Sequence, residues 1–202
     1  METSLKGKFL IAMPALDDPN FERSVIFICE HTPEGAMGFV INKDTPDISL
    51  TALFAQLKIP LSDAFLAKAD HDIVRSGGPC HPSNGFVVFP NGSRTTDSEA
   101  RDTPASEKEK IEIINDTYCF SSDLAFLRDI AAGEGPEKFV MVLGFAGWDA
   151  GQLEAELLEN SWLHVDADED LVYTTNLDTV WQRAVSKLGF EPSHLSSFSG
   201  RA

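Results

Sequence analysis

Cysteine and histidine stand close together twice in this sequence, so a metal site is the first chemistry to test. Cys29 and His31 are two residues apart in a predicted strand and would share one face of it, and His81 follows Cys80 directly. Thiolate and imidazole are ligands that zinc prefers, and four of them can close a tetrahedral site. These spacings match no standard zinc motif, however, and adjacent residues of an extended chain point to opposite faces. We therefore expect no metal, with Cys29 either a buried thiol or a redox-sensitive one.

The stretch 138–153 holds a second candidate site, because an apolar run broken by glycines leads directly into an amphipathic segment. We expect a buried strand over 139–143, a turn over 144–151, and a helix that Asp149 caps from three residues before a glutamine. Such a turn can present backbone N–H groups to an anion, so Gly147 and Asp149 are candidate ligand-binding residues. The glycine spacing matches neither a dinucleotide fingerprint nor a P-loop, and a capping carboxylate repels phosphate. Close packing of strand against helix is therefore the alternative interpretation.

Two polar turns are further candidates, since loops at the ends of strands are where binding groups gather. One turn contains Asp18 and Asn20, and the other contains Gly77 and Gly78. With His31 at the end of a predicted strand, these turns would frame a pocket if the fold brought them together. Each turn is also a common structural device. The pocket supports two alternatives: an enzyme, hydrolytic in type, or a protein that binds a nucleotide or another anion near Asp18, His31 and Gly78.

Known catalytic motifs are missing from the sequence. It has no Gly-x-Ser-x-Gly elbow and no His-Glu-x-x-His motif. Asp166, Asp168 and Asp170 alternate like the start of a calcium loop, but the glycine and glutamate that such a loop requires are absent. The glutamates within 154–159 are expected to form a solvated helix face. We therefore expect no cofactor, and the catalytic residues of the enzyme alternative stay unassigned.

Hydrophobic periodicity predicts the elements that must position these residues. Strands are expected at 9–15, 24–31 and 37–42 as an antiparallel meander, and at 72–75, 85–89, 139–143, 162–165 and 171–173, with a hairpin over 111–120. Besides the helix after residue 149, helices are expected after Ser49, from Ser122 to Gly133, and over 177–188. Short strands in meanders followed by late helices indicate an α+β or mixed α/β domain. The polar stretch 91–110 is expected to be a surface loop, and the tail 190–202 to be frayed.

The charge balance excludes several classes of partner. The chain has 32 acidic and 16 basic residues, a formal net charge of −16. Such a surface repels both nucleic acid and anionic membranes, so we expect no direct contact with either. The sequence shows no signal peptide and no apolar span of membrane length. Its three widely spaced cysteines favour a reducing compartment, and we expect a cytoplasmic protein.

Short motifs recur along nearly the whole chain, at 9–16, 18–21, 24–25, 29–31, 35–38, 42–43, 77–79, 143–148, 151–154, 160–162 and Trp181. Together these segments resemble the motifs of the YqgE/AlgH family of bacterial proteins. The resemblance implies one α/β domain over 1–202, in which a branched mixed sheet folds partly into a pseudo-barrel with helices packed on it. It supplies no established activity, cofactor or catalytic residue, although some members are named as transcriptional regulators.

The sequence therefore favours a non-enzymatic binding or regulatory protein that acts indirectly, through a protein partner or a small-molecule ligand. A strongly acidic chain without a basic recognition helix is poorly suited to bind DNA directly. The candidate ligand-binding residues are Asp18, Asn20, His31, Gly77, Gly78, Gly147 and Asp149. The oligomeric state stays open.

Overall fold

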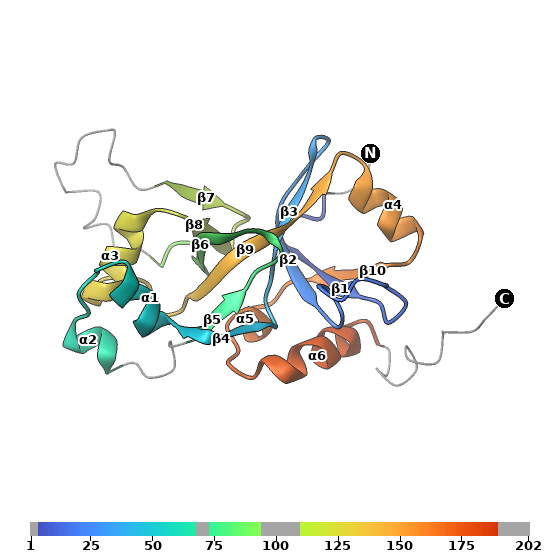
Figure 1. The fold of residues 1–202 in the computed structure, drawn as a ribbon. Coiled ribbons are helices and arrows are strands. Elements are labelled where there is room, and N and C mark those ends of the chain that lie inside the picture. The colour runs from blue at the N-terminus through green and yellow to red at the C-terminus, as the bar shows by residue number, and fades with distance from the viewer. Residues whose placement is uncertain (1–3, 68–72, 94–109, 190–202) are drawn as a thin grey trace.

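The computed structural model describes residues 4–67, 73–93 and 110–189. Most of the predicted surface loop 91–110 and the whole predicted tail 190–202 lie outside these ranges. The described chain forms a single domain in which a curled sheet carries helices packed against it (Figure 1). The prediction of an α+β domain with a branched mixed sheet is confirmed.

The main path of the sheet holds eight strands, and every neighbouring pair in it is antiparallel. Their order is β10 (Trp162–Asp166), β1 (Lys8–Ala12), β2 (Val25–Thr32), β3 (Gly35–Val40), β9 (Val140–Asp149), β6 (Cys80–Pro90), β8 (Tyr118–Ser121) and β7 (Ile111–Ile113). The predicted meander of the first three strands and the hairpin around Asn115 are both confirmed. Two further strands, β4 (Asp44–Ser49) and β5 (Ile73–Ser76), branch off this path.

The branch lies on β9, which runs diagonally through the centre of the molecule in Figure 1. The first half of β9 pairs with β6 on one edge and, in parallel, with β5 on the other. Its second half pairs with β3 instead, from Gly35 opposite Asp149 to Gly38 opposite Ala146. β9 thus pairs with three strands: β3, β5 and β6. The predicted turn over 144–151 is therefore wrong, because the strand continues through Gly144 and Gly147 to Asp149.

A close approach between two backbones makes this branch possible. A Cβ atom on Gly77 would lie 2.4 Å from the carbonyl oxygen of Gly144, and one on Gly78 would lie 2.3 Å from the carbonyl carbon of Phe145. Gly78 and Gly144 also have φ angles of +146° and +73°, which residues with a side chain rarely adopt. Gly144, which lies in the predicted anion-binding turn, is therefore needed where the strands cross. The predicted turn that contains Gly77 and Gly78 is short, because β6 already begins at Cys80, before the predicted start of that strand at residue 85.

Helices cover the sheet in three groups, each with its own apolar cluster. The first group is α1 (Leu50–Gln56), α2 (Asp63–Leu66) and α3 (Leu124–Ala132); the second is α5 (Glu169–Val172), the 3₁₀ turn η4 (Leu177–Thr179) and α6 (Val180–Lys187); the third is α4 (Gln152–Leu158). In Figure 1 the first group lies at one end of β9 and α4 at the other. None of the described helices is long and apolar enough to cross a membrane.

Several predicted helix boundaries are confirmed and others are wrong. Ser49 caps α1, and Gly133 ends α3 as predicted. The cap of α3 is Asp123 and not Ser122, and the predicted strand 171–173 is mostly helical, because the Asp168 side chain accepts from the backbone N–H of Leu171 and starts α5.

The cap predicted for α4 is also wrong. Its N-cap residue is Gly151, and no side chain fills that role. Only half of the expected capping box forms, since Gln152 Oε1 accepts from the backbone N–H of Asp149 at 3.0 Å.

The carboxylate of Glu156 fixes α4 to the sheet. Its Oε2 accepts from the indole N–H groups of Trp148 (2.9 Å) and Trp162 (2.7 Å), while its Oε1 accepts from the amide of Gln152 at 2.8 Å. The predicted solvated glutamate face is therefore wrong at this residue. Buried indole donors need an acceptor, and one carboxylate here supplies it for both rings.

We predict that Glu156→Ala lowers the free energy of unfolding by about 2–4 kcal/mol, because two indole donors lose their acceptor. Glu156→Gln keeps one side-chain oxygen and should cost about 1 kcal/mol. Urea unfolding of both variants measures the difference. Equal losses for the two substitutions would contradict this role of the carboxylate.

Candidate functional site

The structure places the predicted site residues in different parts of the molecule. Asp18 and Asn20 lie in the loop before β2, whereas His31 lies near the other end of that strand. Six residues of extended chain between Val25 and His31 span roughly 20 Å. Gly77 and Gly78 lie at the strand crossing. Asp18 and His31 therefore lie far apart along β2, and the pocket described below is lined by none of Asp18, His31 and Gly78.

Asp18 and Asn20 form a closed turn. The Asp18 carboxylate accepts from the backbone N–H of Asn20 at 2.8 Å, and its carbonyl accepts from Phe21 at 3.0 Å. The carbonyl of Asn20 in turn accepts from the Lys43 ammonium at 2.8 Å. These contacts give both residues a structural role in fixing the loop.

His31 has both ring nitrogens engaged. Its Nδ1 accepts from the backbone N–H of Leu5 at 3.0 Å, so the ring proton sits on Nε2 and is donated to Glu154 Oε1 at 2.7 Å. This bond, together with the backbone N–H of Glu154 itself as the larger cause, lowers the pKa of the Glu154 carboxyl. Glu154 is thus a second exception to the predicted solvated face. As placed, His31 ties the N-terminal segment to α4 and has no lone pair free to act as a base.

A bulge in β2 puts His31 on the face opposite Cys29. The register between β2 and β3 shifts between Ile28 and Glu30, so His31 pairs with Ala36. Ala36 belongs to the apolar cluster of Ile28, while Cys29 belongs to the cluster on the other side of the sheet. The expectation that Cys29 and His31 share one face is therefore wrong.

Gly147 and Asp149 lie on β9 and pair across the ladder with Met37 and Gly35. Because they belong to a strand, their backbone groups do not form the anion-binding turn that the spacing indicated. No cluster of three or more His, Cys, Asp or Glu side chains that could hold a metal ion occurs within residues 4–67, 73–93 and 110–189.

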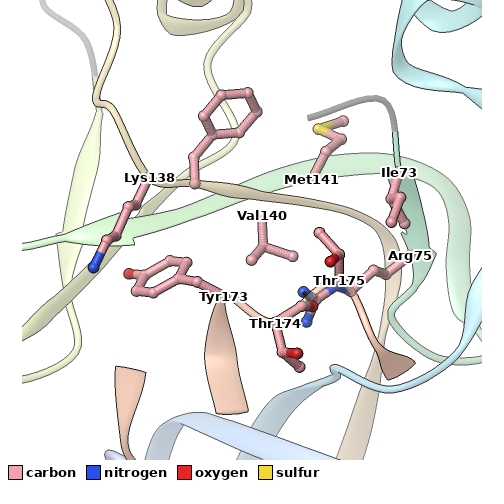
Figure 2. Close-up of a pocket in the computed structure, with 9 residues that line it drawn as sticks. Ile73, Arg75, Lys138, Val140, Met141, Tyr173, Thr174 and Thr175 are labelled. Atoms are coloured by element: carbon pink, nitrogen blue, oxygen red, sulfur yellow. Dashed lines mark hydrogen bonds between the residues drawn. The ribbon is translucent and has the colours of Figure 1, made fainter. Parts of the chain in front are cut away.

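A pocket of about 340 Å³ lies elsewhere, between β5, the start of β9 and the segment that follows α5. We call it the Arg75 pocket. Its lining residues, drawn in Figure 2, are Ile73, Arg75, Lys138, Phe139, Val140, Met141, Tyr173, Thr174 and Thr175. This described lining contains no histidine, cysteine or carboxylate. The pocket can therefore offer a ligand positive charge, hydroxyl groups and apolar surface, and its described groups that could exchange a proton are Lys138 and Tyr173.

Arg75 is the charged residue of this pocket that is buried, with only 4% of its surface exposed. Its Nη1 donates to the carbonyl oxygens of Ile41 (2.6 Å) and Val172 (2.8 Å), and its Nη2 donates to that of Thr174 (2.8 Å). Burial lowers the pKa of Arg75 to about 10, so the side chain stays charged at neutral pH. No Asp or Glu among the described residues forms an ion pair with it. A buried cation whose described contacts are all with neutral carbonyls is unusual, because buried charges are normally paired.

Tyr173 adds a second unmatched group. Its hydroxyl is buried and has no hydrogen-bond partner among the described residues. Burial raises the pKa of Tyr173, so the hydroxyl keeps its proton and remains a donor without an acceptor. In Figure 2 the hydroxyl points toward the Lys138 side chain, away from the Arg75 end of the pocket. The Lys138 ammonium lies 3.4 Å from the Glu169 carboxylate.

Neither Arg75 nor Tyr173 was among the predicted site residues. Arg75 was assigned to a short strand and Tyr173 to a strand that is mostly helix. One signal was present in the sequence: an arginine directly after Ile73 and Val74 in a strand that must pack in the core.

Comparisons with known proteins agree on one family. A family model described as AlgH-like matches residues 9–193. UPF0301 proteins of Methylobacterium nodulans and Ruegeria pomeroyi are each 40% identical to the chain, covering 98% of it and 90% and 99% of their own lengths. The solution structure of the AlgH protein from Pseudomonas aeruginosa is similar with a TM-score of 0.74 and 36% identity, covering 100% of this chain and 98% of that one. A crystal structure from Corynebacterium diphtheriae shares the fold, with a TM-score of 0.68 at 18% identity over 100% of this chain and 94% of that one.

We predict that Arg75→Met lowers the free energy of unfolding by about 2–4 kcal/mol, because three backbone carbonyls lose a charged donor. Arg128→Met, at an exposed position on α3, serves as the matched control and should change stability by no more than about 0.5 kcal/mol. Chemical denaturation of both variants gives the comparison. A protein that is unchanged or stabilised by Arg75→Met would show that the buried charge does not hold the segment after α5.

The three free thiols should differ sharply in reactivity. Cys29 and Cys119 are buried, and burial raises the pKa of both, whereas Cys80 is partly exposed. We predict that a chromogenic disulfide reagent labels one thiol quickly in the native protein and the other two only after denaturation. Cys80→Ser should remove the fast phase. A fast phase that survives this substitution would mean that Cys29 or Cys119 is accessible, as the redox-sensitive alternative for Cys29 requires.

Proposed function

We propose that this chain, which belongs to the AlgH-like family, is a non-enzymatic protein that binds a small molecule in the Arg75 pocket and acts through a protein partner. The observation that carries the proposal is the buried Arg75 guanidinium, which lines a pocket without a described carboxylate to neutralise it. An anionic ligand would supply the missing countercharge.

The pocket supports binding better than it supports catalysis. General acid–base and nucleophilic mechanisms need paired groups within hydrogen-bond reach. The described lining has no histidine, cysteine or carboxylate, and its Lys138 ammonium lies 3.4 Å from the Glu169 carboxylate. His31, the strongest base candidate of the hydrolytic alternative, uses both nitrogens structurally. Asp18 uses a carboxylate oxygen to close its own turn.

A regulatory role can follow from where Arg75 donates its hydrogen bonds. Two of its three acceptors, the carbonyls of Val172 and Thr174, belong to the end of α5 and the segment after it. α5 packs against α6. A ligand on Arg75 would therefore act on the segment that joins these helices, and a partner could sense the change there.

An indirect route also fits the charge of the chain. Some relatives of this family are named as transcriptional regulators, yet a formal net charge of −16 opposes direct contact with DNA. A cytoplasmic location is part of the proposal and is supported by three cysteines that remain free thiols.

Native mass spectrometry of protein purified without added ligand tests the binding role. We expect part of the wild-type population to carry one small molecule per chain, and we expect Arg75→Lys, which keeps the charge but loses the planar guanidinium, to lose that species. A bound species that persists in Arg75→Lys, or wild-type chains that stay empty even after incubation with a low-molecular-weight cell extract, would contradict the proposal. Substrate turnover abolished by a substitution at Asp18, Asn20, His31 or Asp149 would also overturn it, in favour of an enzyme.

A further inference from the structure

Resting on the binding role proposed above, the geometry points to one ligand class: a small organic carboxylate with an apolar body and a second oxygen that accepts a hydrogen bond. We assign its carboxylate to Arg75, its apolar body to the pocket wall at Val140, and its second oxygen to the Tyr173 hydroxyl.

The Arg75 end of the pocket selects the anion. A guanidinium has five N–H donors, and the three bonds to backbone carbonyls leave the Nε–H and one Nη2 hydrogen without a described partner. The carbonyls orient the side chain but do not cancel its charge. A planar group with two donors that have no described partner is well suited to a carboxylate, which offers two oxygens in one plane.

The walls of the pocket argue against a heavily charged ligand. Four of the nine lining side chains are apolar: Ile73, Phe139, Val140 and Met141. An inorganic or nucleotide phosphate would have to give up strongly bound water against these groups, whereas the chain of an organic acid would lose only unfavourable hydration. A volume of about 340 Å³ lies at the low end of the range for ligand pockets, so one small molecule fits better than a dinucleotide.

The Tyr173 hydroxyl indicates what the far end of the ligand carries. It is a buried donor without a described acceptor, and in Figure 2 it lies beyond Val140 from the Arg75 guanidinium. Leaving a buried hydroxyl unpaired costs free energy, and a keto or hydroxyl oxygen of the ligand would remove that cost. This arrangement favours an oxo acid over a plain fatty acid.

Calorimetric titrations with four probes test the assignment: hexanoate, hexanamide, 5-oxohexanoate and inorganic phosphate. We expect hexanoate to bind at least about ten-fold more tightly than hexanamide, because the amide has no charge for Arg75. We expect the keto group of 5-oxohexanoate to add about three- to ten-fold, the gain from one hydrogen bond. Inorganic phosphate should not compete with either acid.

Tyr173→Phe isolates the second contact. It should abolish the advantage of 5-oxohexanoate over hexanoate while leaving hexanoate binding unchanged. Without ligand its melting temperature should be equal to or above that of the wild type, because an unpaired buried hydroxyl has been removed. Tyr118→Phe is the matched control, since the two rings lie 6.4 Å apart but Tyr118 does not line the pocket. This variant should keep the advantage.

Each contrary result has a distinct meaning. Equal affinity for hexanoate and hexanamide would overturn the carboxylate assignment, and effective competition by phosphate would show a general anion site. An advantage of the oxo acid that survives Tyr173→Phe would overturn the role of the hydroxyl. If native mass spectrometry finds a bound molecule but no carboxylate probe binds, the ligand class is wrong and the binding role stands. If neither experiment finds binding, both are wrong.

Discussion

The close crossing of two backbones at Gly77–Gly78 and Gly144–Phe145 is the constraint on which the rest of this structure depends. Without side chains at the glycines, β5 can lie parallel to the first half of β9 while β3 takes the second half. Arg75 stands in β5 just before this crossing. The crossing therefore places the Arg75 guanidinium in the interior. There it donates to the carbonyl of Ile41, just after β3, and to that of Val172, at the end of α5. A Cβ atom at the crossing would separate the strands and remove the site together with the branch.

Arg75 contributes both to the stability of the fold and to the proposed binding of a ligand. Arg75 donates to one carbonyl just after β3 and to two at and after the end of α5, and it does so with a charge that the described chain leaves unneutralised. In a chain with twice as many acidic as basic residues, a buried cation without a described carboxylate beside it is a specific arrangement and not a consequence of composition. Its cost is offset in part by the carbonyl dipoles, and an anion in the pocket would offset more of it.

Much of the fold could be predicted from the sequence, because periodicity and caps act locally. The meander from β1 to β3, the Ser49 cap and the Gly133 stop all depend on residues near in sequence. The predictions were wrong where contacts between segments far apart in the sequence determine the local structure. Gly144 was predicted to lie in a turn. It has to be a glycine because the backbone of Gly78, far away in the sequence, leaves no room for a side chain there. The bulge in β2 places His31 on the face opposite to the one that strand alternation predicts. Tyr173 was predicted to lie in a strand, but it follows a short helix that Asp168 caps. The Arg75 pocket could not be predicted, since its lining comes from three separate segments.

The central claim is that the buried guanidinium of Arg75 receives an organic acid, and the side-chain Nε–H signals of arginine report on this most directly. In an NMR titration of ¹⁵N-labelled protein with 5-oxohexanoate, the Arg75 Nε–H signal should show a large, saturable shift. The Nε–H signals of exposed arginines such as Arg128 and Arg183 should barely move. An Arg75 signal that stays in place at saturating ligand, or that moves no more than those of the exposed arginines, would show that Arg75 does not bind the acid.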